Sequence, residues 1–143
     1  MIELASFATP ELEEAFARLI PQLSTSTTPM VEEEIDELLS QEASDLILYK
    51  DDAGKIQGML TLVTFTIPTG TRAWIEDVVV DSAARGQGAG MQLVEAALEL
   101  AAKRGAKTVD LTSRPAREAA NRLYQRAGFE RRDTNVYRYT KTD

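Results

Sequence analysis

The 143-residue sequence contains no cysteine and no histidine. Without cysteine the chain has no disulfide and no thiolate nucleophile, and without histidine it lacks the commonest metal ligand and the commonest base near neutral pH. We therefore predict a protein without a bound metal. Any proton transfer must use a carboxylate, a tyrosine, a lysine, the backbone or water.

Long apolar runs are also missing. No stretch approaches the ~20 apolar residues that cross a membrane, and the N-terminal MIELASFATPELEE carries acids where a secretory signal has a positive start. We expect a cytoplasmic protein with no membrane partner. A chain of this length with 43% hydrophobic residues suits one compact domain over residues 1–143 and leaves no room for a second.

Positive charge is scarce in the first third of the chain. Residues 1–50 hold eleven acids against Arg18 and Lys50, whereas residues 103–141 hold eleven bases against four acids. The net charge of −7 argues against nucleic acid as a partner. The distribution would steer a polyanionic cofactor to the basic part and a cationic substrate to the acidic part, although solvated helix faces also account for the acids.

The central stretch from Trp74 to Met91 reads WIEDVVVDSAARGQGAGM. Its continuous valines, 78–80, predict a strand that is covered on both faces. Three glycines at alternate positions then precede an amphipathic segment, so the backbone can curl closely at a helix start. Free N–H groups at the positive end of a helix dipole suit a phosphate group.

Three phosphate-binding motifs compete for this loop. A P-loop needs Lys followed by Ser or Thr where Met91-Gln92 stands, and a dinucleotide fingerprint needs a third glycine at Met91. Asp110, the candidate acidic partner of such a fingerprint, lies inside a predicted strand. The remaining pattern is Arg-x-x-Gly-x-Gly, and it resembles the pyrophosphate loop of the GNAT acetyltransferases at Arg85, Gly88 and Gly90.

Apolar periodicity and turn residues predict the order β, α, α, β, β, β, α, β, α, β, β. Strands are expected in 2–6, 46–50, 55–65, 74–80, 108–113, 129–132 and 136–139. Helices are expected in 10–23, 29–39, 91–104 and 116–127. The loop between the first two helices is either free to contact a substrate or a plain connector.

This order is similar to that of the GNAT family, and a second motif matches the family at the expected distance from the first, Ala120-Asn121-Arg122-Leu123-Tyr124 followed by Gly128-Phe129. The resemblance covers the whole chain. It implies an α/β (α+β) fold with one mixed, mostly antiparallel sheet of about seven strands flanked by four helices. It also implies that the central parallel pair of strands splays apart and that acetyl-CoA lies in the cleft between them.

The resemblance implies specific roles for the loop and its strand. Backbone N–H groups would hold the pyrophosphate, and they belong to Gly86, Gln87, Gly88, Ala89, Gly90 and Met91. Arg85 would add charge, with a surface salt bridge as the alternative. The backbone of Val78, Val79 and Val80 would pair with the pantetheine amides like an added strand. The N–H of Val78 would polarise the thioester carbonyl.

Tyr124 matches the tyrosine that the family places near the cofactor sulfur as the general acid for the departing thiolate. Arg117, Asn121 and Tyr124 share one face of the last helix at spacings i, i+4 and i+7. Asn121 would hold the pantetheine or position the tyrosine. The alternative is a core tyrosine whose hydroxyl bonds to the backbone.

Glu76 and Asp77 form a carboxylate pair inside an apolar strand, which is costly to bury unless the pair has partners or a function. By alternation only one of them faces a given side unless a bulge intervenes. We predict Glu76 as the general base, directly or through a water, because it shares phase with Val78. Asp77 is the reserve, as a substrate or structural anchor. Arg114 either binds a substrate carboxylate or phosphate or lies at the surface.

The resemblance therefore implies an acyl-CoA-dependent N-acetyltransferase that acts on a small-molecule or peptide amine by direct attack, since no cysteine is present for a covalent route. The run Ile75-Glu76-Asp77 is similar to that of glucosamine-6-phosphate acetyltransferases, but a match of three residues is too short to assign their substrate to this protein. A non-catalytic CoA-binding or protein-interaction module is the alternative function. The C-terminal hairpin or the open flank of the sheet would support a homodimer.

Overall fold

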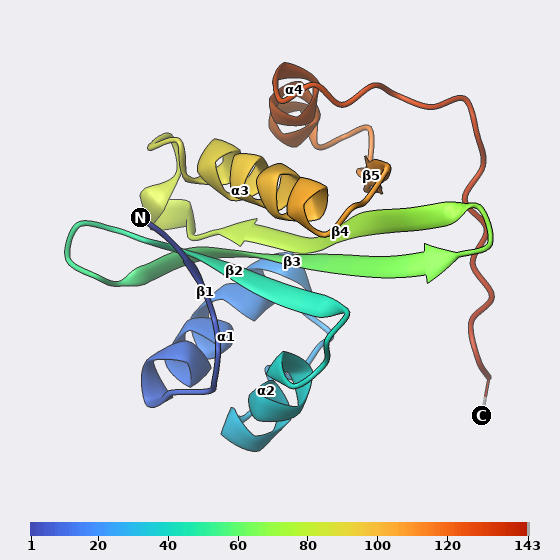
Figure 1. The fold of residues 1–143 in the computed structure, drawn as a ribbon. Coiled ribbons are helices and arrows are strands. Elements are labelled where there is room, and N and C mark those ends of the chain that lie inside the picture. The colour runs from blue at the N-terminus through green and yellow to red at the C-terminus, as the bar shows by residue number, and fades with distance from the viewer. Residues whose placement is uncertain (143) are drawn as a thin grey trace.

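The computed structural model describes residues 1–142, in which a mixed sheet lies between two layers of helices (Figure 1). The five strands of these residues follow the spatial order β1-β2-β3-β4-β5. Their bounds are Ile2–Leu4, Ser44–Lys50, Ile56–Ile67, Gly70–Val80 and Thr108–Asp110. Neighbouring strands from β1 to β4 are antiparallel, and β5 is parallel to β4.

Four α-helices flank the sheet within residues 1–142, together with the 3-10 turn η1 (Ser82–Ala84). They are α1 (Pro10–Leu23), α2 (Glu32–Leu39), α3 (Ala89–Lys103) and α4 (Glu118–Arg126). Helix α1 begins where predicted, since Thr9 Oγ1 accepts the Leu12 N–H at 3.0 Å. Helix α2 begins three residues later than predicted, where the Glu34 carboxylate accepts the N–H of Val31 at 3.1 Å.

Each face of the sheet has its own hydrophobic core. Helices α3 and α4 cover one face, where Leu60, Leu62 and Leu93 have no exposed surface. Helices α1 and α2 cover the other, where Leu19 and Ile35 are equally buried. Apolar side chains thus alternate between the two faces along the central strands, as a sheet covered on both sides requires.

The predicted C-terminal strands 129–132 and 136–139 do not form. The segment 129–142 leaves the body of the protein as an extended, irregular chain (Figure 1), and its three large apolar residues are 70–92% exposed, namely Val136, Tyr137 and Tyr139. Strand β5 has only three residues and therefore offers few backbone partners at this edge. A hairpin without a packed apolar face is marginal in water. The described sheet consequently has five strands, not about seven.

No helix in residues 1–142 has the length and apolar character needed to span a bilayer. The same residues contain no cluster of three or more acidic, histidine or cysteine side chains that could hold a metal ion.

Candidate active site

Strands β4 and β5 run together for only three residue pairs. Arg72, Ala73 and Trp74 pair with residues 108–110, and β4 then continues alone on this side from Ile75 to Val80. The described residues therefore leave one flank of β4 without a strand partner. The backbone groups on this flank remain available to a ligand that adds as a strand.

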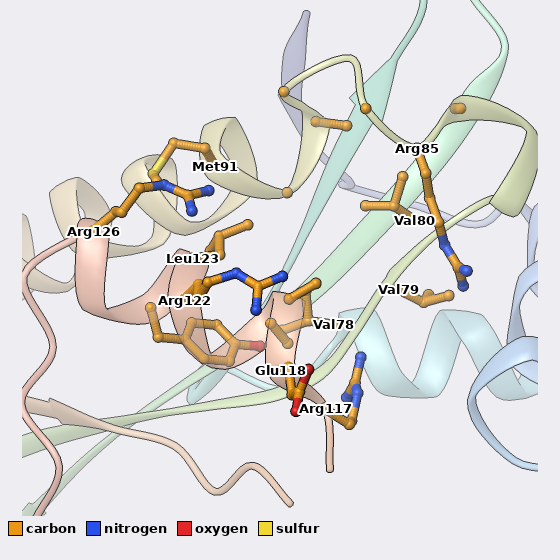
Figure 2. Close-up of a pocket in the computed structure, with 18 of the residues that line it drawn as sticks. Val78, Val79, Val80, Arg85, Met91, Arg117, Glu118, Arg122, Leu123 and Arg126 are labelled. Atoms are coloured by element: carbon orange, nitrogen blue, oxygen red, sulfur yellow. The ribbon is translucent and has the colours of Figure 1, made fainter. Parts of the chain in front are cut away.

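A cavity of about 900 Å³, here called the large cavity, lies along this flank (Figure 2). Residues 78–80 of β4 form one wall and α4 forms the opposite wall, while the loop from Ala84 to Met91 closes the end. These are three segments that the sequence motifs single out. The fold brings them together around one space.

The glycine loop takes a conformation that its glycines allow. Gly86 and Gly88 have φ angles of 85° and 79°, in the left-handed region where a side chain is strained. A Cβ on Gly90 would lie 2.9 Å from Leu123 Cδ1, so a small residue here lets α3 start close to α4.

Several N–H groups of this loop have no backbone acceptor. Those of Gly86, Gln87 and Gly88 make no short, well-aligned hydrogen bond to a carbonyl of the described chain. Those in the first turn of α3, 89–91, precede any intrahelical partner. Such a concave set of donors at a helix N-terminus suits an anion. The side chain of Gln87 is exposed and does not line the large cavity.

Four arginines line the large cavity, and Glu118 is the one acid among its lining residues in 1–142. They come from the loop and from α4 with its N-terminal turn: Arg85, Arg117, Arg122 and Arg126. Figure 2 shows the guanidinium group of Arg122 extending from α4 into the space before β4. Sequence reasoning did not assign Arg122 or Arg126 to the site, although the excess of bases in 103–141 was the signal that could have found them.

Tyr124 lines the large cavity and is only 8% exposed. Its ring packs edge-on against Phe129 with centroids 5.9 Å apart, and its hydroxyl makes no hydrogen bond within residues 1–142. Burial raises the pKa of the Tyr124 hydroxyl, and the positive charge of Arg117 opposes this shift. The hydroxyl therefore stays protonated at neutral pH and can donate a proton into the cavity.

Asn121 does not line the large cavity. Its carboxamide donates to the carbonyl oxygens of Arg114 and Arg117 at 2.9 and 2.8 Å, which fixes the turn that leads into α4. Arg114 is exposed and lines neither the large cavity nor the smaller one described below. Its role toward a substrate stays a prediction.

A β-bulge separates Glu76 from Val79. Thr61 pairs with Glu76 and Met59 pairs with Val79, so two residues of β4, Asp77 and Val78, oppose one residue of β3. Asp77 has a φ angle of 51°, which Asp adopts more readily than most residues. The bulge that would let both carboxylates face one side is therefore present.

The bulge reverses which side of the sheet the odd-numbered side chains of β4 point to. Ala73 and Ile75 pack on the α3 side, whereas Val79, also at an odd position, packs on the α1 side. Asp77 accordingly lines a second cavity of about 210 Å³ beside α1, here called the small cavity. Glu76 is exposed and lines neither cavity.

An ion pair anchors the loop to α1. Asp81, 7% exposed, directly follows β4 and accepts from Arg18 Nη1 at 2.7 Å and from the Ala83 N–H at 3.0 Å. The Ala83 N–H and then Arg18 lower the pKa of the Asp81 carboxyl. Gln22 adds a contact, since its side-chain oxygen accepts the Ser82 N–H at 3.0 Å. Sequence reasoning missed this pair, whose members are 63 residues apart.

Comparisons with known proteins agree with the motifs. A model of the Acetyltransferase (GNAT) family matches residues 9–129. Glucosamine 6-phosphate N-acetyltransferase 1 from Oryza sativa subsp. japonica is 31% identical over 138 residues, which cover 90% of this chain and 81% of that protein.

Two solved structures share the fold along nearly the whole chain. A putative acetyltransferase from Agrobacterium tumefaciens str. C58 has a TM-score of 0.84 at 23% identity, with 98% of this chain and 99% of that chain covered. The aminoglycoside acetyltransferase meta-AAC0020 from an uncultured soil metagenomic sample, in complex with trehalose, has a TM-score of 0.84 at 20% identity, with 100% and 96% covered. The family match spans most of the sequence, and the chain therefore belongs to the GNAT acetyltransferases, enzymes that use acetyl-CoA as their co-substrate.

Proposed function

We propose that this protein moves an acetyl group from acetyl-CoA to a small primary amine by direct attack, and that the large cavity holds the coenzyme. The observation that carries the proposal is the convergence of three features on that cavity: unpaired strand backbone, a loop of free N–H groups and a buried tyrosine. A volume of about 900 Å³ lies in the range of sites for large cofactors.

The loop and the arginines suit the phosphates of the coenzyme. The N–H groups of residues 86–91 hold the diphosphate at the N-terminus of α3, and Arg85 adds charge. Arg122 and Arg126 lie one turn apart on α4 and supply positive charge along the opposite wall. The backbone of Val78–Val80, which has no strand partner on this flank, pairs with the amides of the pantetheine arm.

The chemistry follows from groups at the end of β4 and on α4. The Val78 N–H donates to the thioester carbonyl oxygen and stabilises the charge that develops there. Glu76, which lines neither cavity, takes a proton from the amine through a water as the N–C bond forms. Tyr124 gives its proton to the sulfur as the C–S bond breaks, and solvent reprotonates the tyrosine. Asn121 fixes the turn before α4 and thereby the position of Tyr124.

A small-molecule acceptor agrees with the relatives, which are named for glucosamine 6-phosphate and aminoglycosides. Two cavities that meet at Leu23 and at the Asp77-Val78 bulge supply separate places for the coenzyme and the acceptor.

The test is release of CoA thiol with a panel of amines, paired with calorimetry of coenzyme binding. Tyr124→Phe keeps the ring and its packing against Phe129 but removes the proton, so we expect kcat to fall by about 10²-fold or more while the Kd for acetyl-CoA changes little. Coenzyme binding without thiol release across the whole panel would instead support a non-catalytic CoA-binding module.

A further inference from the structure

The small cavity has an unusual lining for an enzyme related to a sugar-phosphate acetyltransferase. It lies between α1, the loop that follows α1, α2 and the bulge of β4. Asp77 is the one charged residue in its lining among residues 1–142. The remainder consists of four hydroxyl residues, Ser24, Thr27, Thr28 and Thr61, and of apolar side chains such as Phe16 and Met59.

The bulge places the small cavity next to the reacting end of the large one. Asp77 opens on the small cavity and Val78, the next residue, opens on the large cavity. Leu23 at the end of α1 lines both. The carboxylate that holds a cation in the small cavity therefore belongs to the residue directly before the one whose N–H is assigned to the thioester carbonyl, which brings the amine to the reacting end of the large cavity.

The charge of the N-terminal helices, which line the small cavity, disfavours an anionic acceptor there. Residues 1–50, which include α1 and α2, carry eleven acids and two bases. Both bases are already in ion pairs: Arg18 with Glu14 and Asp81, and Lys50 with Glu3. Neither basic side chain of residues 1–50 is therefore free to meet a phosphate or carboxylate.

The volume limits the acceptor as well. The volume of about 210 Å³ lies below the roughly 300 Å³ at which sites for drug-sized ligands begin. That is room for a short alkyl or single-ring amine but not for an oligosaccharide.

We propose that the acceptor is a small primary amine with an apolar body and no anionic group, whose ammonium is held by Asp77 until it loses one proton to solvent and becomes the attacking amine. This assignment rests on the proposed acetyl transfer and specifies its acceptor. The hydroxyl residues in the lining, among which Ser24 Oγ and Thr27 Oγ1 lie 3.0 Å apart, accommodate a limited polar group on the amine.

Two matched pairs of amines test the charge preference. Phenylalanine adds a carboxylate to 2-phenylethylamine, and glucosamine 6-phosphate adds a phosphate to glucosamine. Thiol release should give a kcat/KM at least about tenfold lower for the anionic member of each pair, because like charges meet next to Asp77. The highest kcat/KM of the four is expected for 2-phenylethylamine.

The variant Asp77→Asn tests the residue itself, since Asn keeps the volume and tolerates a positive φ angle. Because Asp77 is exposed, its ion pair with an ammonium should be weak, and we expect KM for 2-phenylethylamine to rise about twofold to fivefold with kcat nearly unchanged. The ratio of kcat/KM for 2-phenylethylamine to that for phenylalanine should fall by a similar factor. Glu33→Gln removes a charge from α2 outside both cavities and should leave both quantities unchanged.

The outcomes separate the two proposals. If glucosamine 6-phosphate is the better member of its pair, or if Asp77→Asn behaves like Glu33→Gln, the acceptor assignment is wrong and acetyl transfer stands. If no amine releases thiol from a protein that still binds acetyl-CoA, the proposed function is contradicted and the assignment falls with it.

Discussion

Replacing Arg18 with methionine should weaken coenzyme binding although Arg18 contributes no atom to the proposed coenzyme contacts. Arg18 Nη1 donates to Asp81 at 2.7 Å, and Nη2 donates to the carbonyl oxygen of Ile56 at 2.7 Å. Asp81 in turn holds the Ala83 N–H of η1, directly before the glycine loop. The substitution keeps the apolar stem but leaves Asp81 without its cation.

The size of the effect follows from these contacts. Hydrogen bonds to charged groups contribute about 1.5–3 kcal/mol each, and the side chain of Arg18 is 21% exposed, which lowers the figure. We expect Arg18→Met to lower the free energy of unfolding by about 2–3 kcal/mol. Arg104→Met is the matched control, because it breaks the more exposed Arg104–Asp45 pair at 2.8 Å, whose contribution should be at most about 1 kcal/mol.

Urea unfolding measures the stability, and calorimetry measures the affinity for CoA. We expect Arg18→Met to raise the Kd for CoA several-fold and Arg104→Met to leave it unchanged, because only the first pair anchors the glycine loop. A native Kd in Arg18→Met, under conditions where the protein is fully folded, would refute the coupling of α1 to the loop.

The pH dependence gives a second check. Because the folded protein lowers the pKa of Asp81 below its ordinary value of 3.8, the carboxylate stabilises the fold above that pH, and this stability is lost as the pH falls through the folded pKa. Acidification should therefore lower the free energy of unfolding by more in the native protein than it does in the Arg18→Met variant. Part of the loss should persist in the variant, since the Ala83 N–H remains the larger cause of the shift.

Three further predictions follow from particular residues. Gly86 and Gly54 have φ angles of 85° and 83°, and a Cβ on either would have no atom within 4 Å. Gly86→Ala and Gly54→Ala should therefore each lower the free energy of unfolding in urea by about 1–2 kcal/mol through backbone strain. Only Gly86→Ala should raise the Kd for CoA. Arg126→Gln should weaken CoA binding and reduce its dependence on salt in calorimetry at two ionic strengths, and an unchanged salt dependence would argue against a phosphate contact. Leu19→Ala should lower the free energy of unfolding by about 2–5 kcal/mol without changing the Kd for CoA.

The conformation of the glycine loop and the apolar face of α3 can be predicted from the sequence because both depend on residues close together in the chain. Alternate glycines impose backbone angles by themselves, and the apolar stripe of α3 depends only on helical spacing. The positions of Val78 and Tyr124 on one cavity follow once the family is recognised, since the two motifs occupy fixed places in one fold.

Other features depend on partners that are distant in the sequence. The C-terminal hairpin has favourable residues but no sufficiently long edge strand to join, because β5 stops after Asp110. The side of the sheet on which the Asp77 side chain lies depends on a bulge that only the pairing with β3 reveals. Arg126 reaches the large cavity through the docking of α4 on the glycine start of α3, and periodicity does not encode that docking.

A crystal structure with saturating acetyl-CoA tests the central claim most directly. We predict that the diphosphate lies within hydrogen-bonding distance of the N–H groups of residues 86–91 and that the thioester carbonyl accepts from the N–H of Val78. Coenzyme bound elsewhere, or a large cavity that remains empty at saturation, would contradict the assignment of every group that lines it.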